Sequence, residues 1–98
     1  MISVKVYRKG LEVLVAACDW DIIGKTFRSE ELKIHVSEGF YKGASGDEDM
    51  LVNRLVMATI ANLVGEKTLE IAIRRGFVDP DRVLVIGGVP HAQMARMM

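Results

Sequence analysis

Three side chains of this sequence carry the functional groups that nucleophilic catalysis uses. Cys18 offers a thiol, Asp19 an orienting carboxylate and His91 an imidazole that can act as a general base. Cys18 ends an apolar stretch, however, and a buried, inert thiol is the more common outcome there. A small enzyme that uses His91 as general base, with Asp19 or Cys18, is therefore the alternative function, and a non-enzymatic binding protein is the leading one.

The C-terminal stretch GGVPHAQ places polar side chains directly after an apolar run. Its two glycines allow a sharp turn or a close backbone approach, and its proline suits a turn or the first position of a short helix. His91 and Gln93 then offer hydrogen-bond donors and acceptors two residues apart. We expect a binding site here, which Asp19 and Tyr41 share if the strand ends converge.

Nucleotide and metal sites are not predicted. The stretch DWDIIGKT resembles the end of a phosphate-binding loop, but Asp19 stands where the first glycine is needed, and Gly24 is better placed to end a helical turn. His35, His91 and Cys18 are scattered ligand types without the spacing of a metal motif. We therefore expect no cofactor and no metal.

A possible contact with RNA lies in the middle of the chain. Phe40, Tyr41 and Lys42 precede the sequence GASG, a pattern that clamps a nucleic-acid backbone in some RNA-binding domains. Two aromatic rings and a cation can bind a base by stacking. Acidic residues at 47–49 would repel phosphate, however, so the competing interpretation is a loop whose aromatic side chains cover the core.

The composition is that of one small globular domain spanning residues 1–98. Half of the residues are hydrophobic, and 13 basic side chains balance 13 acidic ones. This balance argues against strong binding of nucleic acid by overall charge, and it permits a homodimer. The single cysteine, with no signal peptide or membrane-spanning run, predicts a cytoplasmic protein.

The hydrophobic pattern predicts the order β-β-(α)-β-α-α-β. Alternation indicates the first three strands, and a β-branched run without alternation indicates a last strand covered on both faces. The expected strands are 2–7, 11–18, 32–37 and 82–86, with a helical turn over 19–24, helices over 46–64 and 66–75, and residues 91–98 as a frayed tail.

Residues that favour helix starts and ends flank the predicted long helix. Ser45 and Glu48 have the spacing of a capping box at its start. Asn62 falls on its buried side and is expected to bond a neighbouring backbone, while Gly65 ends the helix and Glu66 caps the next one.

Four separated motifs, AACD, FYKG, ANLVGE and GGVPHAQ, together resemble the small archaeal family called domain of unknown function 424. The similarity runs from the first strand to Gln93. The resemblance implies association with translation factors, and so with RNA or a ribosomal protein, but no particular activity. The family positions that it carries over to this chain are Asp19, Gly24, Phe40, Tyr41, Gly43, Asn62, Gly65, Glu66, Gly88, Pro90, His91 and Gln93.

The sequence therefore predicts an α+β domain with a mainly antiparallel, four-stranded sheet that two long helices cover on one face. We expect a cytoplasmic binding protein attached to translation or RNA machinery. The expected binding residues are His91, Gln93, Asp19, Phe40, Tyr41 and Lys42, and the expected structural residues are Gly24, Gly43, Asn62, Gly65, Glu66, Gly88 and Pro90.

Overall fold

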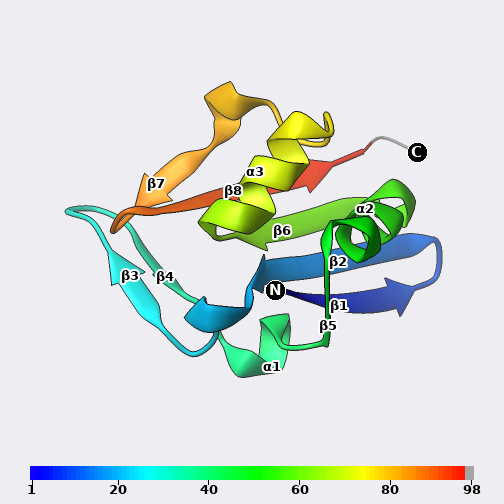
Figure 1. The fold of residues 1–98 in the computed structure, drawn as a ribbon, viewed down its shortest axis with the longest axis horizontal. Coiled ribbons are helices and arrows are strands. Elements are labelled where there is room, and N and C mark those ends of the chain that lie inside the picture. Colours follow the sequence, from blue (N-terminus) through cyan, green and yellow to red (C-terminus); the bar gives the residue numbers. More distant parts are fainter. Residues whose placement is uncertain (97–98) are drawn as a thin grey trace.

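A six-stranded sheet forms the centre of the structure, a computed structural model that describes residues 1–96 (Figure 1). The strands lie in the order β5-β1-β2-β6-β8-β7, and all neighbours are antiparallel except β2 and β6. Their bounds are β1 Ile2–Lys9, β2 Glu12–Asp19, β5 Ala44–Gly46, β6 Ile60–Val64, β7 Leu84–Ile86 and β8 Val89–Ala95. The predicted mainly antiparallel α+β domain is confirmed, but the predicted number of strands was too small.

The first two strands form the hairpin that their alternation predicted. Gly10 takes a φ of +58° in the turn, a conformation that glycine adopts without steric cost. The pairing runs from Ile2 opposite Asp19 to Lys9 opposite Glu12.

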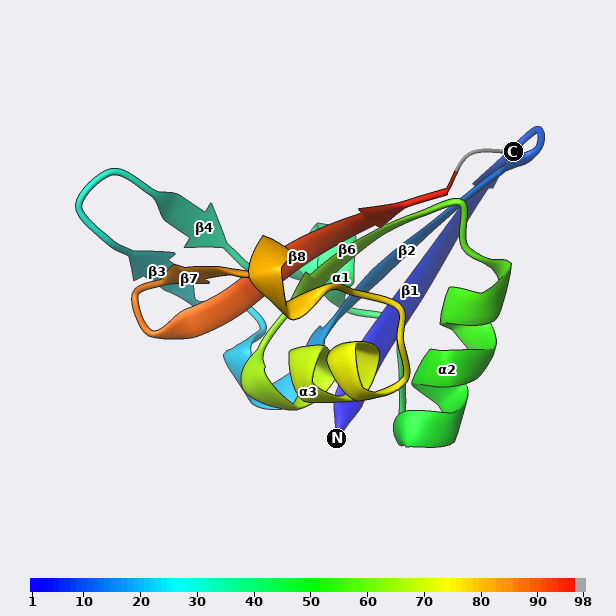
Figure 2. The same cartoon turned by 90° about the horizontal axis from the view of Figure 1, so that it is seen from above.

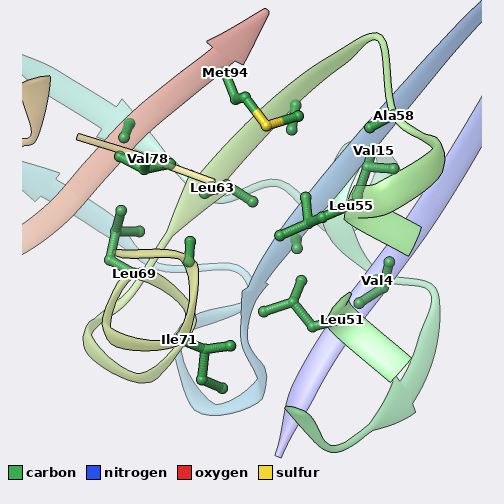
Figure 3. Close-up of a cluster of buried hydrophobic side chains, with 14 of the residues drawn as sticks. Val4, Val15, Leu51, Leu55, Ala58, Leu63, Leu69, Ile71, Val78 and Met94 are labelled. Carbon is green, nitrogen blue, oxygen red and sulfur yellow. The ribbon is translucent and has the colours of Figure 1, made fainter. Parts of the chain in front are cut away.

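Two helices, α2 (Glu48–Met57) and α3 (Glu66–Arg74), cover one face of the sheet, as predicted (Figure 2). Their apolar sides and the facing strand residues form the main core. Figure 3 shows this cluster, which includes Val15, Leu51, Leu55, Leu63, Leu69, Ile71 and Met94. Among residues 1–96, no helix is both long and apolar enough to cross a bilayer.

The opposite face carries a separate two-stranded hairpin and a short helix, which are β3 (Thr26–Arg28), β4 (Lys33–His35) and α1 (Glu38–Tyr41). The hairpin projects at the end of the sheet where β7 turns into β8 (Figures 1 and 2). A second buried cluster lies beneath it and includes Ala16, Cys18, Val36, Tyr41 and Val64. The strand predicted over 32–37 therefore exists in part, but it lies outside the main sheet.

The long helix predicted over 46–64 was wrong in its second half. Helix α2 ends at Met57, and Ile60–Val64 forms β6 between β2 and β8. Thr59 fixes the change, because its N–H donates to Val13 O at 2.8 Å and its hydroxyl accepts from Val13 N–H at 2.9 Å. A short apolar run reads alike as a buried helix or a buried strand, and here the parallel pairing with β2 makes it a strand.

The C-terminal part also differs from the prediction. Strand β7 is a short edge strand rather than a covered one, since Leu84 is 51% and Val85 is 62% exposed. Gly87 and Gly88, with φ of +57° and +83°, make a two-residue turn into β8. Residues 91–95 are therefore part of a strand of the sheet and not a frayed tail, while residues 97–98 lie outside the described chain.

The start of α2 uses a different cap from the predicted one. Asp47 Oδ1 accepts from the backbone N–H of Met50 at 3.3 Å, whereas Ser45 lies in β5. The capping box of Ser45 and Glu48 was therefore wrong, although a side-chain cap does begin the helix.

The predicted helical turn after β2 is present as η1, Trp20–Ile22. Gly24 follows it with a φ of +87°, as its predicted structural role requires. The Asp19 side chain makes no hydrogen bond to η1, because it is engaged elsewhere.

Candidate functional site

Asp19 ends β2 and caps the first turn of α3. Its Oδ2 accepts from the Lys67 backbone N–H at 3.0 Å, and its Oδ1 accepts from the Thr68 N–H and hydroxyl at 2.8 and 2.7 Å. Gly65 precedes the helix with a φ of +114°, and a Cβ added there would lie 2.5 Å from the Asp19 Cγ. Asp19 therefore makes the cap that was predicted for Glu66, which lies exposed in the first turn.

Cys18 lies on the sheet face opposite the helices and is fully buried. Burial, with Asp19 and Asp21 nearby, raises the pKa of its thiol to about 12, so the reactive thiolate is scarce near neutral pH. Cys18 is paired with Val64, and Val64 with His91, so a whole strand separates the thiol from the imidazole. Among residues 1–96, no group of three or more His, Cys, Asp or Glu side chains is placed to hold a metal ion.

His91 and Gln93 lie on β8 and point to the sheet face opposite the helices. The His91 Nδ1 is 3.0 Å from Leu63 O, and because a carbonyl only accepts, this nitrogen carries the proton. In the neutral ring, Nε2 is then left as an acceptor. Gln93 Nε2 donates a hydrogen bond to Asn62 Oδ1 at 2.9 Å. Asn62 was predicted to lie on a helix and to bond a neighbouring backbone, but it lies on β6 and bonds a side chain.

A hollow of about 700 Å³ lies beside these residues, within the size range of ligand sites. Two of the predicted binding residues, His91 and Gln93, line it, whereas Asp19 and Tyr41 do not. The remaining side chains that define it include Ile60, Arg82, Leu84 and Ala95. The structure thus brings His91 and Gln93 together and leaves Asp19 and Tyr41 outside this hollow.

The three residues predicted to stack on RNA are placed differently from one another. Tyr41 is only 6% exposed, and burial, with Cys18 nearby, raises the pKa of its hydroxyl to about 12. Phe40 is half-buried and stacks on Tyr7 with ring centroids 5.5 Å apart. Lys42 is exposed and lies 5.9 Å from the centre of the Trp20 ring. Tyr41 is therefore part of the core and is not an accessible stacking surface.

The GASG stretch packs along β1. Ser3 Oγ donates to Tyr41 O at 2.9 Å and accepts from the Gly43 N–H at 2.8 Å. A Cβ added at Gly43 would overlap the Val4 carbonyl, so glycine is required by a close backbone approach. The GASG stretch is therefore held against β1 and is not an open loop that could clamp phosphates.

A basic surface that was not predicted from the sequence lies on the β3–β4 hairpin. Phe27 and Ile34 pack toward the sheet, and Arg28 and Lys33 are exposed and directly opposite each other. Lys25, also exposed, stands one residue before β3. We call Lys25, Arg28 and Lys33 the hairpin cations.

Two further polar groups lie on the exposed side of this hairpin. Thr26 is opposite His35, and its hydroxyl oxygen is 2.8 Å from the His35 Nδ1. The signal in the sequence was the short alternation TFR followed by KIH, with one apolar residue at each centre. Each half is only three residues long, so the pattern is recognisable only once the two halves are paired.

The fold defines a small α+β protein built on a mixed six-stranded sheet with a short hairpin over one face. The chain belongs to the family described as protein of unknown function DUF424, which it matches over residues 7–97, so the resemblance is confirmed. It is also similar to an uncharacterized conserved protein from Methanopyrus kandleri, whose crystal structure superposes with a TM-score of 0.79 at 25% identity. That similarity covers 99% of this chain and 95% of the other. A search of curated proteins found no match.

Proposed function

We propose that this chain is a non-enzymatic RNA-binding protein that works with translation or RNA machinery. In this proposal the outer face of the β3–β4 hairpin binds phosphate groups. The observation that carries it is the Arg28–Lys33 pair beside Lys25: within residues 1–96, no carboxylate oxygen lies within 4.0 Å of these cations.

Like charges placed directly opposite each other weaken a strand pair. A phosphate bound between Arg28 and Lys33 removes that repulsion and gains charge-assisted hydrogen bonds, which the Arg28 guanidinium can make in bidentate fashion. The Thr26 hydroxyl is of a type that commonly contacts phosphate oxygens as well. The unliganded arrangement is therefore one that a polyanion stabilises.

The charge balance of the chain makes this attraction local. The total charge is zero, and Glu30 and Glu31 lie exposed in the turn between β3 and β4. Their carboxylates repel phosphate at the tip of the hairpin. RNA is therefore expected to cross the hairpin near Lys25 and the Arg28–Lys33 pair.

The enzyme alternative receives no support from the geometry. Its base, His91, is separated by Val64 from the neutral thiol of Cys18. Both carboxylate oxygens of Asp19 accept hydrogen bonds from the start of α3. Neither residue is positioned to assist a proton transfer at His91.

An archaeal origin and a cytoplasmic location are part of the same proposal. The Methanopyrus kandleri relative supports the first, and the single buried Cys18 is consistent with the second.

Fluorescence anisotropy of a labelled oligouridylate, titrated with the protein at several salt concentrations, tests the proposal. The hairpin variant replaces Lys25, Arg28 and Lys33 by Gln. For single strands, each phosphate contact contributes about 0.7 to the slope of log affinity against log salt, so the variant should lower this slope by about 2.

The matched control replaces three exposed cations elsewhere, Arg8, Lys9 and Lys67, by Gln, which changes the net charge equally. It should bind RNA with nearly the parental slope. No binding by the parent at low salt, or an equal loss in both variants, would refute the hairpin as the RNA-binding surface.

A further inference from the structure

Strand β8 extends well past its outer neighbour. It spans Val89–Ala95, but β7 pairs with it only from Leu84, opposite His91, to Ile86, opposite Val89. From residue 92 onward, β8 therefore has a strand neighbour only on its β6 side. Figure 1 shows β8 continuing beyond β7, beside β6, toward the C-terminus.

The hydrogen bonds to β6 reveal which backbone groups of β8 face outward. Gly65 N–H donates to Pro90 O at 2.9 Å, and Arg96 N–H donates to Thr59 O at 2.8 Å. In an antiparallel pair these bonded positions alternate, so residues 90, 92, 94 and 96 direct their amide groups at β6. The N–H and C=O groups of Gln93 and Ala95 therefore point away from β6, where no strand of residues 1–96 meets them.

The space beside this edge is open on both sides of the sheet. The hollow of about 700 Å³ lies along one side, and a second one of about 220 Å³ is lined by Phe77, Asp79 and Met94 on the other. Arg82, Gln93 and Ala95 line both. Arg82 is exposed and makes no ion pair or side-chain hydrogen bond within the described chain.

The segment before β7 does not pair with the outer edge of β8. Pro80–Arg82 form the short helix η2, and Asp79 Oδ1 accepts from the Asp81 N–H at 2.9 Å to begin it. The backbone therefore joins the line of β7 only at Leu84. Sheet edges are normally protected by Pro, Lys or a bulge, and Gln93–Ala95 has none of these.

We infer that the open edge of β8 at Gln93–Ala95 binds an extended peptide segment of a partner protein by strand addition. The partner backbone continues the line of β7 and pairs with the outward amide groups of Gln93 and Ala95. A carboxylate side chain on the partner pairs with Arg82, which lines both hollows and makes no ion pair within residues 1–96. Leu84 supplies exposed apolar surface at the inner end of the groove.

The first experiment measures backbone amide hydrogen exchange by NMR in the free protein. The N–H groups of Ala92 and Met94, bonded to β6, should exchange slowly, and that of Gln93 should exchange much faster. Equal protection at these three positions would mean that the edge is already occupied, and would overturn the inference. Protection of Gln93 that rises with protein concentration would overturn it too, because a second copy would then be the occupant.

The second experiment selects binders from a phage-displayed library of linear peptides and measures the affinity of the selected peptides. Ala95→Pro removes an outward N–H without touching any bond to β6, a position where an edge strand tolerates proline. It should weaken binding at least about five-fold, as expected for one backbone hydrogen bond. Ala95→Ser keeps the N–H and is the matched control.

The selected peptides should be enriched in Asp or Glu, and Arg82→Gln should weaken their binding. The hairpin variant with Gln at 25, 28 and 33 should bind them normally, which separates this surface from the proposed RNA-binding one. Equal affinity of the Ala95→Pro and Ala95→Ser proteins, with both folded, would overturn the inference. So would a loss of peptide binding on substitution of Met1 or Trp20, which line a separate hollow, combined with unchanged binding by proteins altered at the β8 edge.

Discussion

Removal of the Asp19 carboxylate should destabilise the protein through the start of α3. The carboxylate accepts from two backbone N–H groups, of Lys67 and Thr68, and from the Thr68 hydroxyl, which is fully buried. Loss of a side-chain cap costs about 0.5–2 kcal/mol, and loss of a negative charge at a helix start adds about 0.3–1 kcal/mol. Asp19→Ala should therefore lower the free energy of unfolding by about 2 kcal/mol.

For a domain of this size, 1 kcal/mol shifts the melting temperature by about 4–8 °C, so the expected decrease is roughly 8–16 °C. Thermal denaturation followed by circular dichroism measures it. Asp21→Ala is the control, because Asp21 is exposed and makes no hydrogen bond through its side chain among residues 1–96. A melting temperature for Asp19→Ala within a few degrees of the Asp21→Ala protein would refute the capping argument.

A double-mutant cycle tests the fit between Asp19 and Gly65. Gly65→Ala alone should be costly, since a φ of +114° strains any side chain and the new Cβ would lie 2.5 Å from the Asp19 Cγ. In the Asp19→Ala background the contacts of the new Cβ with Cγ and Oδ1 of residue 19 are removed, and a 2.9 Å contact with its Cβ and the backbone strain remain. The two changes should therefore destabilise less together than their separate effects add up to, whereas additivity would show that the two residues do not constrain each other.

Four further outcomes follow from the packing. Hydrogen bonds from Arg74 and Arg75 lower the pKa of Glu48 to about 2. The stabilising effect of its carboxylate should therefore be present above about pH 4.5 and lost as the pH falls toward 2. In acid denaturation, the difference in stability between the parent and a Glu48→Gln protein should disappear over that range. Cys18, with a pKa of about 12, should resist alkylation near pH 8 in the native protein and react after denaturation; rapid native labelling would contradict its burial. Tyr41→Ala should lower the free energy of unfolding by about 3–5 kcal/mol, as for other buried aromatic side chains, and an unchanged melting temperature would show that the ring is not part of the core. Asn62→Leu should cost less than about 1 kcal/mol in urea denaturation, because its partner Gln93 is exposed and can bond water instead.

Local patterns in the sequence determined several parts of the fold. The β1–β2 hairpin followed from alternation and a glycine, since both strands are half-buried and adjacent in the chain. Helix α3 and its terminal glycine were also predicted, because its apolar stripe has a helical period and Gly76 takes a φ of +81° at its end. The ion pair from Glu70 to Arg74 depends only on spacing within that helix.

Tertiary pairing decided the central strand and the C-terminal strand. Apart from Asn62, residues 60–64 are apolar on both faces, and such a run satisfies either a buried helix or a buried strand. Only the partners β2 and β8, which lie far away in the sequence, make it a strand. Strand β8 was missed for a related reason. Its alternation is short, with only Ala92 and Met94 in the main core, and the pairing with β6 is what makes the segment a strand.

Of the candidate sites too, one part followed from the sequence and another only from the tertiary structure. The sequence identified His91 and Gln93 as polar residues after a turn, because that prediction needs only their residue types and the glycine pair before them. It could not show that Asp19 caps a helix forty-eight residues away, from Asp19 to Lys67, nor that Arg28 stands opposite Lys33. Nor could it show that Gln93 and Ala95 form an open edge, because an unpaired strand edge is a property of where the neighbouring strand ends, and that is fixed by packing between distant segments.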